Sequence, residues 1–255
     1  MKAKFAFLGI FAASLAFAHF GVLTTDKNVV EDQKDATLKL NLEFSHPFLQ
    51  ESMNLQKPAE FGVFIDGEKK SLLGSLKEQK KGENSYFAAE FKADKPSLLA
   101  FYFDPKPYAE PAERKMIRHI TKTYVDAYGA GEGWDKPLGL EAEIVPLVRP
   151  YALYAGEIFS GVFLLHGKPV PGADVEIELY NDKGYKAPSE AHVTQVVKTN
   201  GAGEFSFVMP VAGWWGFAAL SEEEAAKGSE QPVNELGAGL FLGLFFLPCC
   251  NSFVG

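Results

Sequence analysis

Residues 37–44 read TLKLNLEF, and this stretch decides the fold class. Leucine or phenylalanine stands at every second position, with Thr, Lys, Asn and Glu between. Successive side chains of a β-strand point to opposite faces, so this spacing predicts a strand buried on one side. Similar short apolar stretches recur at residues 61–65, 86–91, 98–103, 142–145, 158–165, 175–179, 193–198 and 205–207. Many short strands between turn residues predict an all-β protein built from β-sandwiches.

Three segments between these strands need a separate interpretation. Residues 116–125 fit a helix or a strand, and their many β-branched side chains favour the strand. Residues 69–83 are rich in Lys, Glu and Gly, which predicts an exposed loop. The Gly-rich segment 128–137 lacks the sequence context of a phosphate-binding loop, so we expect an ordinary connection there.

The strand pattern starts again near residue 141 and divides the chain into two halves. We expect an N-terminal β-sandwich over residues 19–142, a C-terminal β-sandwich over 143–246 and a tail over 247–255. The stretch GLFLGLFFLPCC at 239–250 is apolar but short and interrupted by Gly and Pro. It fits a final core strand, an anchor or a frameshifted end, and these alternatives stay open.

The first 18 residues have the three parts of a secretory leader. Lys2 and Lys4 precede an apolar run, and Ala16-x-Ala18 is a small-residue cleavage site. We therefore expect cleavage after Ala18 and a periplasmic location. Losing two lysines takes the net charge from −8 to about −10, and no basic block suits a nucleic-acid backbone. The two cysteines, Cys249 and Cys250, are adjacent, which disfavours an unstrained disulfide between them.

Five stretches carry a resemblance to a known family. GKPVPGADVEIELY (167–180) and TNGAGEFSFVMPVAGWWGFAAL (199–220) resemble small immunoglobulin-like or transthyretin-like domains. Together with FSHPF (44–48), FYFDPKPYAEPAERKMIRHITKTYVDAYG (101–129) and EAEIVPLVRPYALYAGEIFSGVFLLHGKPVPGA (141–173), they make residues 19–240 resemble the DUF4198 family. The family includes NikK-like periplasmic components of nickel and cobalt uptake transporters. The resemblance implies a protein that handles Ni(II) or Co(II) beside an energy-coupling-type membrane importer.

Cleavage after Ala18 would make His19 the first residue of the mature chain. Its freed α-amine and its imidazole Nδ1 then form one chelating pair, and further nitrogen ligands would complete a tetragonal site that suits Ni(II) or Cu(II). His46 ends a predicted strand before Pro47, where it can project into a cleft. His119 lies in the segment 116–125 as a further ligand, or else as a surface histidine paired with Glu113. We predict a metal site from His19, His46 and His119.

The remaining candidates have simpler interpretations. His166 and His192 fit solvated surface residues, and Asp104, Glu113 and Met53 are weaker candidate ligands or partners of ligands. Of the adjacent pair Trp214 and Trp215, strand alternation predicts that one faces the core, which disfavours a sugar-stacking surface.

Three functions fit these features of the sequence. The first is capture of a nickel or cobalt ion and its delivery to an importer. A periplasmic copper protein with an N-terminal histidine is the second, because copper binds nitrogen sites more tightly than nickel. The third is a structural or adhesive pair of domains without a metal. No motif of a known catalytic class stands in the sequence, so we expect a binding protein and not an enzyme.

Overall fold

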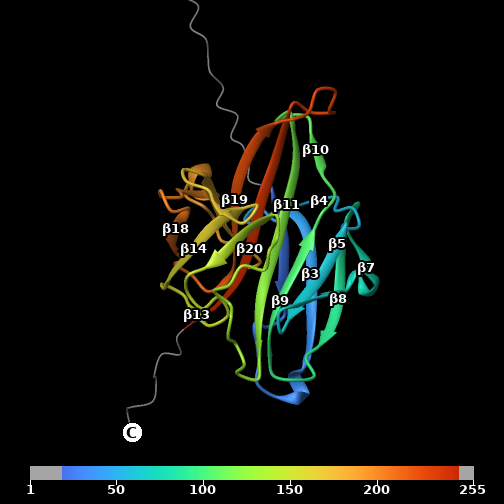
Figure 1. The fold of residues 1–255 in the computed structure, drawn as a ribbon, viewed down its shortest axis with the longest axis vertical. Coiled ribbons are helices and arrows are strands. Elements are labelled where there is room, and N and C mark those ends of the chain that lie inside the picture. The colour runs from blue at the N-terminus through green and yellow to red at the C-terminus, as the bar shows by residue number, and fades with distance from the viewer. Residues whose placement is uncertain (1–18, 247–255) are drawn as a thin grey trace, which may run out of the picture.

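The computed structural model describes residues 19–246, and all of its extended regular structure is β-strand (Figure 1). Three short 3-10 turns, at Gln33–Asp35, Leu73–Ser75 and Glu190–His192, interrupt the strands. The all-β prediction is therefore confirmed. The described part of the chain has no helix with the length and hydrophobicity of a membrane span. The predicted leader and the residues of the expected tail lie outside the described range.

A five-stranded antiparallel sheet forms one layer of the N-terminal half. Its order is β1-β3-β8-β7, and β4 pairs with the end of β3. The stretch TLKLNLEF lies in β3, and its Leu38, Leu40 and Leu42 are fully buried, as the alternation predicts. The strands are β1 (Phe20–Thr25), β3 (Thr37–His46), β4 (Glu51–Met53), β7 (Lys77–Lys81) and β8 (Asn84–Lys92).

A large sheet of eleven strands extends through both halves of the chain, in the order β17-β16-β19-β20-β11-β9-β5-β6. Three short strands, β2, β10 and β13, pair with β11 or β20 beside this path. The bounds are β2 (Val29–Val30), β5 (Glu60–Ile65), β6 (Glu68–Ser71), β9 (Ser97–Asp104), β10 (Tyr108–Glu110), β11 (Lys115–Ala127), β13 (Leu153–Tyr154), β16 (Asp174–Leu179), β17 (Gln195–Lys198), β19 (Gly213–Glu224) and β20 (Val233–Phe245).

A four-stranded sheet completes the second half. It has the order β12-β14-β15, and β18 pairs with β14. Aromatic side chains from it, such as Phe159 and Phe205, pack against Phe217 of β19. Its strands are β12 (Ala142–Pro146), β14 (Ile158–Leu165), β15 (Lys168–Pro169) and β18 (Glu204–Val208).

The two small sheets cover opposite faces of the large one. Along β20, Leu240 and Leu242 pack in the core under the four-stranded sheet, whereas Phe241 between them meets Phe20 of β1. Alternation along one strand thus supplies both layers. Two main cores result, one for each half of the chain.

The parallel pairing of β11 with β20 joins the two halves. It runs from Lys115 beside Val233 to Thr123 beside Phe241. The expected boundary between residues 142 and 143 falls within β12, but the large sheet continues across both halves. The two expected sandwiches therefore share one sheet.

The structure tests the predictions made for several single segments. Residues 116–125 lie in β11, so the strand interpretation is confirmed. The loop predicted over residues 69–83 is wrong, because this segment contributes to β6 and contains β7. Both strands are exposed along their whole length and rich in lysine, which is typical of strands at the edge of a sheet. Their sequences therefore lack the alternation of apolar and polar residues that predicts a strand. Trp215 is buried, in agreement with the predicted core role for one of the two tryptophans.

The apolar stretch 239–250 now divides into two parts. Residues 239–245 belong to β20, a central strand of the large sheet, so this part is a core strand. Cys249 and Cys250 lie outside the described residues.

Candidate metal centre

Strand pairing brings His19 next to His46. β1 begins at Phe20 and pairs antiparallel with the end of β3, where Phe20 lies opposite Ser45. Continuing this register by one residue places His19 opposite His46. The centroids of the two imidazole rings are 4.8 Å apart, and the His19 ring also stacks on Phe44 at 5.8 Å. The first described residue is thus held at the end of the five-stranded sheet.

Two carboxylates lie beside the His19 ring. Glu110 Oε2 is 3.6 Å from Nε2, and Glu113 Oε1 is 3.7 Å from Nδ1. Both glutamates belong to the hairpin between β10 and β11. Arg114, next to Glu113, has a φ of 62°, which closes this tight turn. The hairpin therefore brings negative charge to the histidine pair.

The surroundings hold His19 in its neutral form. Burial, together with His46 and His119, lowers the pKa of the His19 imidazole from 6.5 to about 4. Glu235 opposes this shift and Lys115 adds to it. Metal ions bind neutral imidazole, so a ring with this pKa needs no deprotonation at neutral pH before it can act as a ligand.

His119 is buried in the large sheet and is 2% exposed. Its Nε2 is 2.8 Å from Glu235 Oε1, while Nδ1 is buried with no hydrogen-bond partner. The alternative interpretation of His119 as a surface histidine paired with Glu113 is wrong. Its partner is Glu235, 116 residues further along the chain, which the parallel pairing of β11 and β20 brings alongside.

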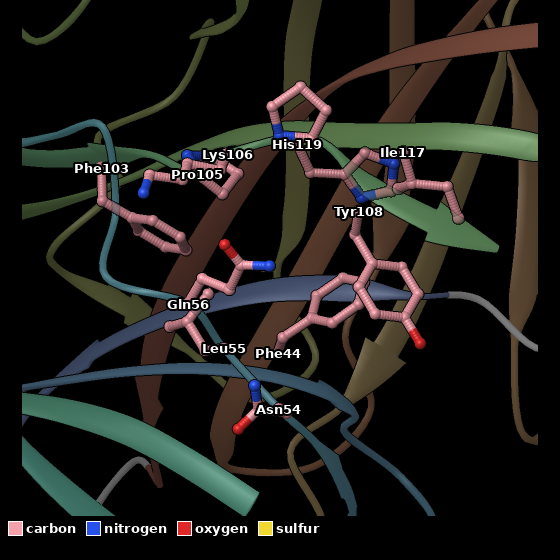
Figure 2. A pocket seen from close by; sticks show the side chains of 12 residues that line it. Phe44, Asn54, Leu55, Gln56, Phe103, Pro105, Lys106, Tyr108, Ile117 and His119 are labelled. Atoms are coloured by element: carbon pink, nitrogen blue, oxygen red, sulfur yellow. The ribbon is translucent and has the colours of Figure 1, made fainter. Parts of the chain in front are cut away.

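A small cavity lies beside His119. Figure 2 shows the His119 ring at its wall together with Tyr108, Phe44 and Ile117. The cavity has a volume of about 20 Å³, which is room for about one water-sized atom. Of the three predicted ligands, His119 lines this cavity, whereas His19 and His46 do not.

The other candidate residues have different surroundings in the structure. Arg118 holds both carboxylate oxygens of Asp104, and Met53 packs against the N-terminal core. His166 and His192 are exposed, as expected from the sequence. Of the two carboxylates beside His19, sequence reasoning named Glu113 but missed Glu110, although both flank the same proline-containing turn.

The described side chains do not form a complete set of metal ligands by themselves. In residues 19–246, no three His, Cys, Asp or Glu side chains are close enough together to hold an ion. The nitrogen of His19 is a peptide nitrogen in the full-length chain, and removal of residues 1–18 would turn it into an amine. The described side chains therefore supply two adjacent rings and nearby carboxylates, and a further ligand would have to come from the amine or from side-chain movement.

Comparison with family models gives a match to the description "Domain of unknown function (DUF4198)" over residues 16–223. The chain belongs to the DUF4198 family. The match covers β1 to β19, and so includes His19, His46 and His119 of this DUF4198 protein. No curated protein matches it.

Solved structures similar to this DUF4198 protein are distant. Titin A168–A169 is 13% identical with a TM-score of 0.24, and the match covers 86% of this chain and 98% of that one. The D00-D0 domain of intimin is 13% identical with a TM-score of 0.22, covering 88% and 100%. Fibronectin(III)-like modules of Clostridium thermocellum CbhA are 7% identical with a TM-score of 0.21, covering 88% and 95%.

Proposed function

We propose that this DUF4198 protein is a periplasmic accessory protein that captures Ni(II) or Co(II) and delivers it to a membrane importer. The ion binds the α-amine and Nδ1 of His19, with His46 and His119 as further nitrogen ligands. The proposal is carried by one observation: the rings of His19 and His46, which are 27 positions apart in the sequence, have their centroids 4.8 Å apart. The family likeness set out above adds the importer as partner.

The electrostatics of the site support a divalent cation. Glu110 and Glu113 lie within 4 Å of the His19 ring nitrogens, and opposite charges attract strongly where water is partly excluded. Imidazole together with carboxylate suits divalent nickel, cobalt, zinc or copper, whereas Cu(I) prefers the soft sulfur of Cys or Met. The side chains around His19 thus favour a divalent ion over Cu(I).

Delivery requires a site that can open. A ligand pair at a chain terminus has this property, because the end of the chain can move without disturbing the strand pairing behind it. A partner's ligands can then replace the amine and the ring one at a time. A metal held by a terminal residue is therefore easier to transfer than one enclosed by four internal side chains.

The experiment compares two purified proteins by calorimetric titration with Ni(II), one that begins at His19 and one with a single alanine before it. The extension turns the His19 nitrogen into a peptide nitrogen, moves the α-amine one residue away and leaves the side chains of residues 19–246 unchanged. We expect a loss in affinity of more than about 100-fold, because losing even an outer partner of a metal ligand costs about 10–100-fold. Equal affinities would overturn the role of the amine.

Two substitutions complete the design. His46→Ala should weaken Ni(II) binding, whereas His192→Ala should leave it unchanged, because His192 is exposed and its Nδ1 lies 2.8 Å from Ser189 Oγ in another part of the molecule. Titration with Co(II) and Cu(II) under the same conditions ranks the metals. In cells, deletion should impair nickel-dependent growth and leave copper tolerance unchanged, and the reverse result would favour a copper protein.

A further inference from the structure

Two residues of β20 hold the His119 ring from different sides. Gly237 lies opposite His119 in the β11–β20 pairing. A Cβ atom built on Gly237 would lie 2.4 Å from Cδ2 and 2.8 Å from Nε2 of the ring, well inside van der Waals contact. The imidazole therefore packs directly on the glycine backbone, and any larger residue at position 237 would displace it.

Glu235 holds the edge of the same ring. Its Oε1 is 2.8 Å from His119 Nε2, and its Oε2 accepts a hydrogen bond from Lys115 Nζ at 2.8 Å. Lys115 Nζ is held in turn by Glu222 Oε1 at 2.5 Å and lies 3.6 Å from Glu113 Oε2. Both oxygens of Glu235 are thus occupied, and its side chain is 5% exposed. The carboxylate is fixed in place before any ion arrives.

This contact determines where the His119 proton sits. An ionised carboxylate can only accept hydrogen bonds, so Nε2 must be the donor. In its neutral form, which is the form that binds a metal, the imidazole carries one N–H, and Nδ1 is then left with its lone pair. Nδ1 is buried without a hydrogen-bond partner, which leaves that lone pair unused. Histidines that bind metals through one nitrogen commonly donate the other N–H to a carboxylate in this way.

The same residues connect His119 to His19. Glu235 contacts His119 and Lys115, Lys115 contacts Glu113, and Glu113 Oε1 lies 3.7 Å from His19 Nδ1. Two of the proposed ligands are thus tied together by one continuous set of charged contacts.

We propose that Glu235 and Gly237 are positioning residues, which fix the His119 ring in the Nε2–H tautomer and present its Nδ1 lone pair to the metal ion. The inference rests on the proposed metal-binding function, but its first test needs no metal. Glu235 supplies the acceptor that selects the tautomer. Gly237 supplies the flat surface that sets the plane of the ring.

The first test records long-range ¹H–¹⁵N NMR spectra of the metal-free protein, labelled at histidine, at pH 8. His119 is assigned with the variant His119→Gln. The wild type should show a protonated Nε2 and a bare Nδ1 at His119. Glu235→Gln should show both tautomers, because an amide can turn either its oxygen or its NH₂ group toward Nε2. A proton on Nδ1 in the wild type, or an unchanged tautomer in Glu235→Gln, would overturn the inference.

The second test measures Ni(II) affinity of the chain that begins at His19. Glu235→Gln and Gly237→Ala should each weaken binding by about 10–100-fold. Glu204→Gln is the matched control, since Glu204 is exposed and its carboxylate contacts Asn200, outside this charged network, and this variant should bind Ni(II) like the wild type. Circular dichroism shows whether each variant keeps its strands.

The two tests separate the inference from the proposed function. If the wild type binds no Ni(II), the proposed function fails, whatever the tautomer of His119. If the wild type binds Ni(II) while Glu235→Gln and Gly237→Ala bind it equally well, the positioning role is overturned and the metal function stands.

Discussion

A neutral imidazole in a buried site makes a protein sensitive to acid, and His19 is such a residue. Its pKa in the folded protein is about 4, because burial and the neighbouring His46 and His119 oppose a positive charge there. In the unfolded chain the pKa returns to about 6.5. Between these two pH values the unfolded state binds more protons than the folded state, so the free energy of unfolding falls as the pH decreases.

The expected consequence is a measurable acid sensitivity that belongs to His19. In the metal-free protein its contribution is complete above pH 6.5 and is lost as the pH approaches 4. Urea unfolding of the wild type and of His19→Gln at several pH values should show the difference in free energy changing by about 2–3 kcal/mol over this range. Parallel pH profiles for the two proteins would contradict the assigned surroundings of His19.

The sequence predicts some residues of the candidate site and misses others. His19 and His46 were predicted from local signals, a cleavage motif and a strand that ends before proline. Glu235 was missed, because it follows its partner His119 by 116 residues and reaches it only through the pairing of β11 with β20. Nothing in the residues around Glu235 indicates that distant partner.

At the scale of elements, the contact between β11 and β20 depends on small residues. Gly239 lies opposite Thr121, and a Cβ built on it would lie 2.2 Å from Thr121 Oγ1. That hydroxyl already donates to the Gly21 carbonyl of β1 at 2.8 Å. One glycine therefore allows three strands, β20, β11 and β1, to approach one another, and β1 is the strand that follows His19.

Substitution of this glycine should destabilise the protein. Gly239→Ala forces Thr121 to move and to give up its bond to β1, and overpacking of this kind costs about 1–3 kcal/mol. The measurement is urea unfolding, with Gly201→Ala as control, because a Cβ on Gly201 meets nothing within 4 Å. Equal stabilities for the two variants would argue against a tight contact at Gly239.

Alternation of apolar and polar residues predicted the half-buried strands well. It failed for two other kinds of strand, which are exposed on both faces or buried on both faces. The edge strands β6 and β7 are exposed on both faces, so their sequences resemble a charged loop. The central strand β20 is largely buried on both faces from residue 237 to 244, so its sequence is a continuous apolar run that also fits an anchor. A buried ion pair between Lys122 and Glu143, 2.6 Å apart, was equally hidden, since both residues look like surface charges in the sequence.

At the scale of the whole molecule, the large sheet makes the two halves depend on each other. The β11–β20 pairing joins strands from both halves, and Asn28 donates hydrogen bonds to the carbonyls of Tyr151 and Gly243. The turn after His46 is also held by the second half, because Glu178 accepts a hydrogen bond from the Phe48 backbone at 2.9 Å. The second half therefore supports the position of His46.

We expect the two halves to unfold together for this reason. Hydrogen exchange followed by mass spectrometry at increasing urea concentrations should show β3 and β8 losing protection at the same midpoint as β14 and β16. A midpoint for one half well below that of the other would show that the halves are independent domains.

The central claim is that the mature N-terminus and a folded β-sheet together form a metal site, and anomalous diffraction tests it most directly. Crystals of the chain that begins at His19, grown with Ni(II), are measured at the nickel absorption edge. The account predicts one ion in direct contact with the amine and Nδ1 of His19 and with the imidazoles of His46 and His119. An ion bound elsewhere, with the nitrogens of His19 free, would contradict it.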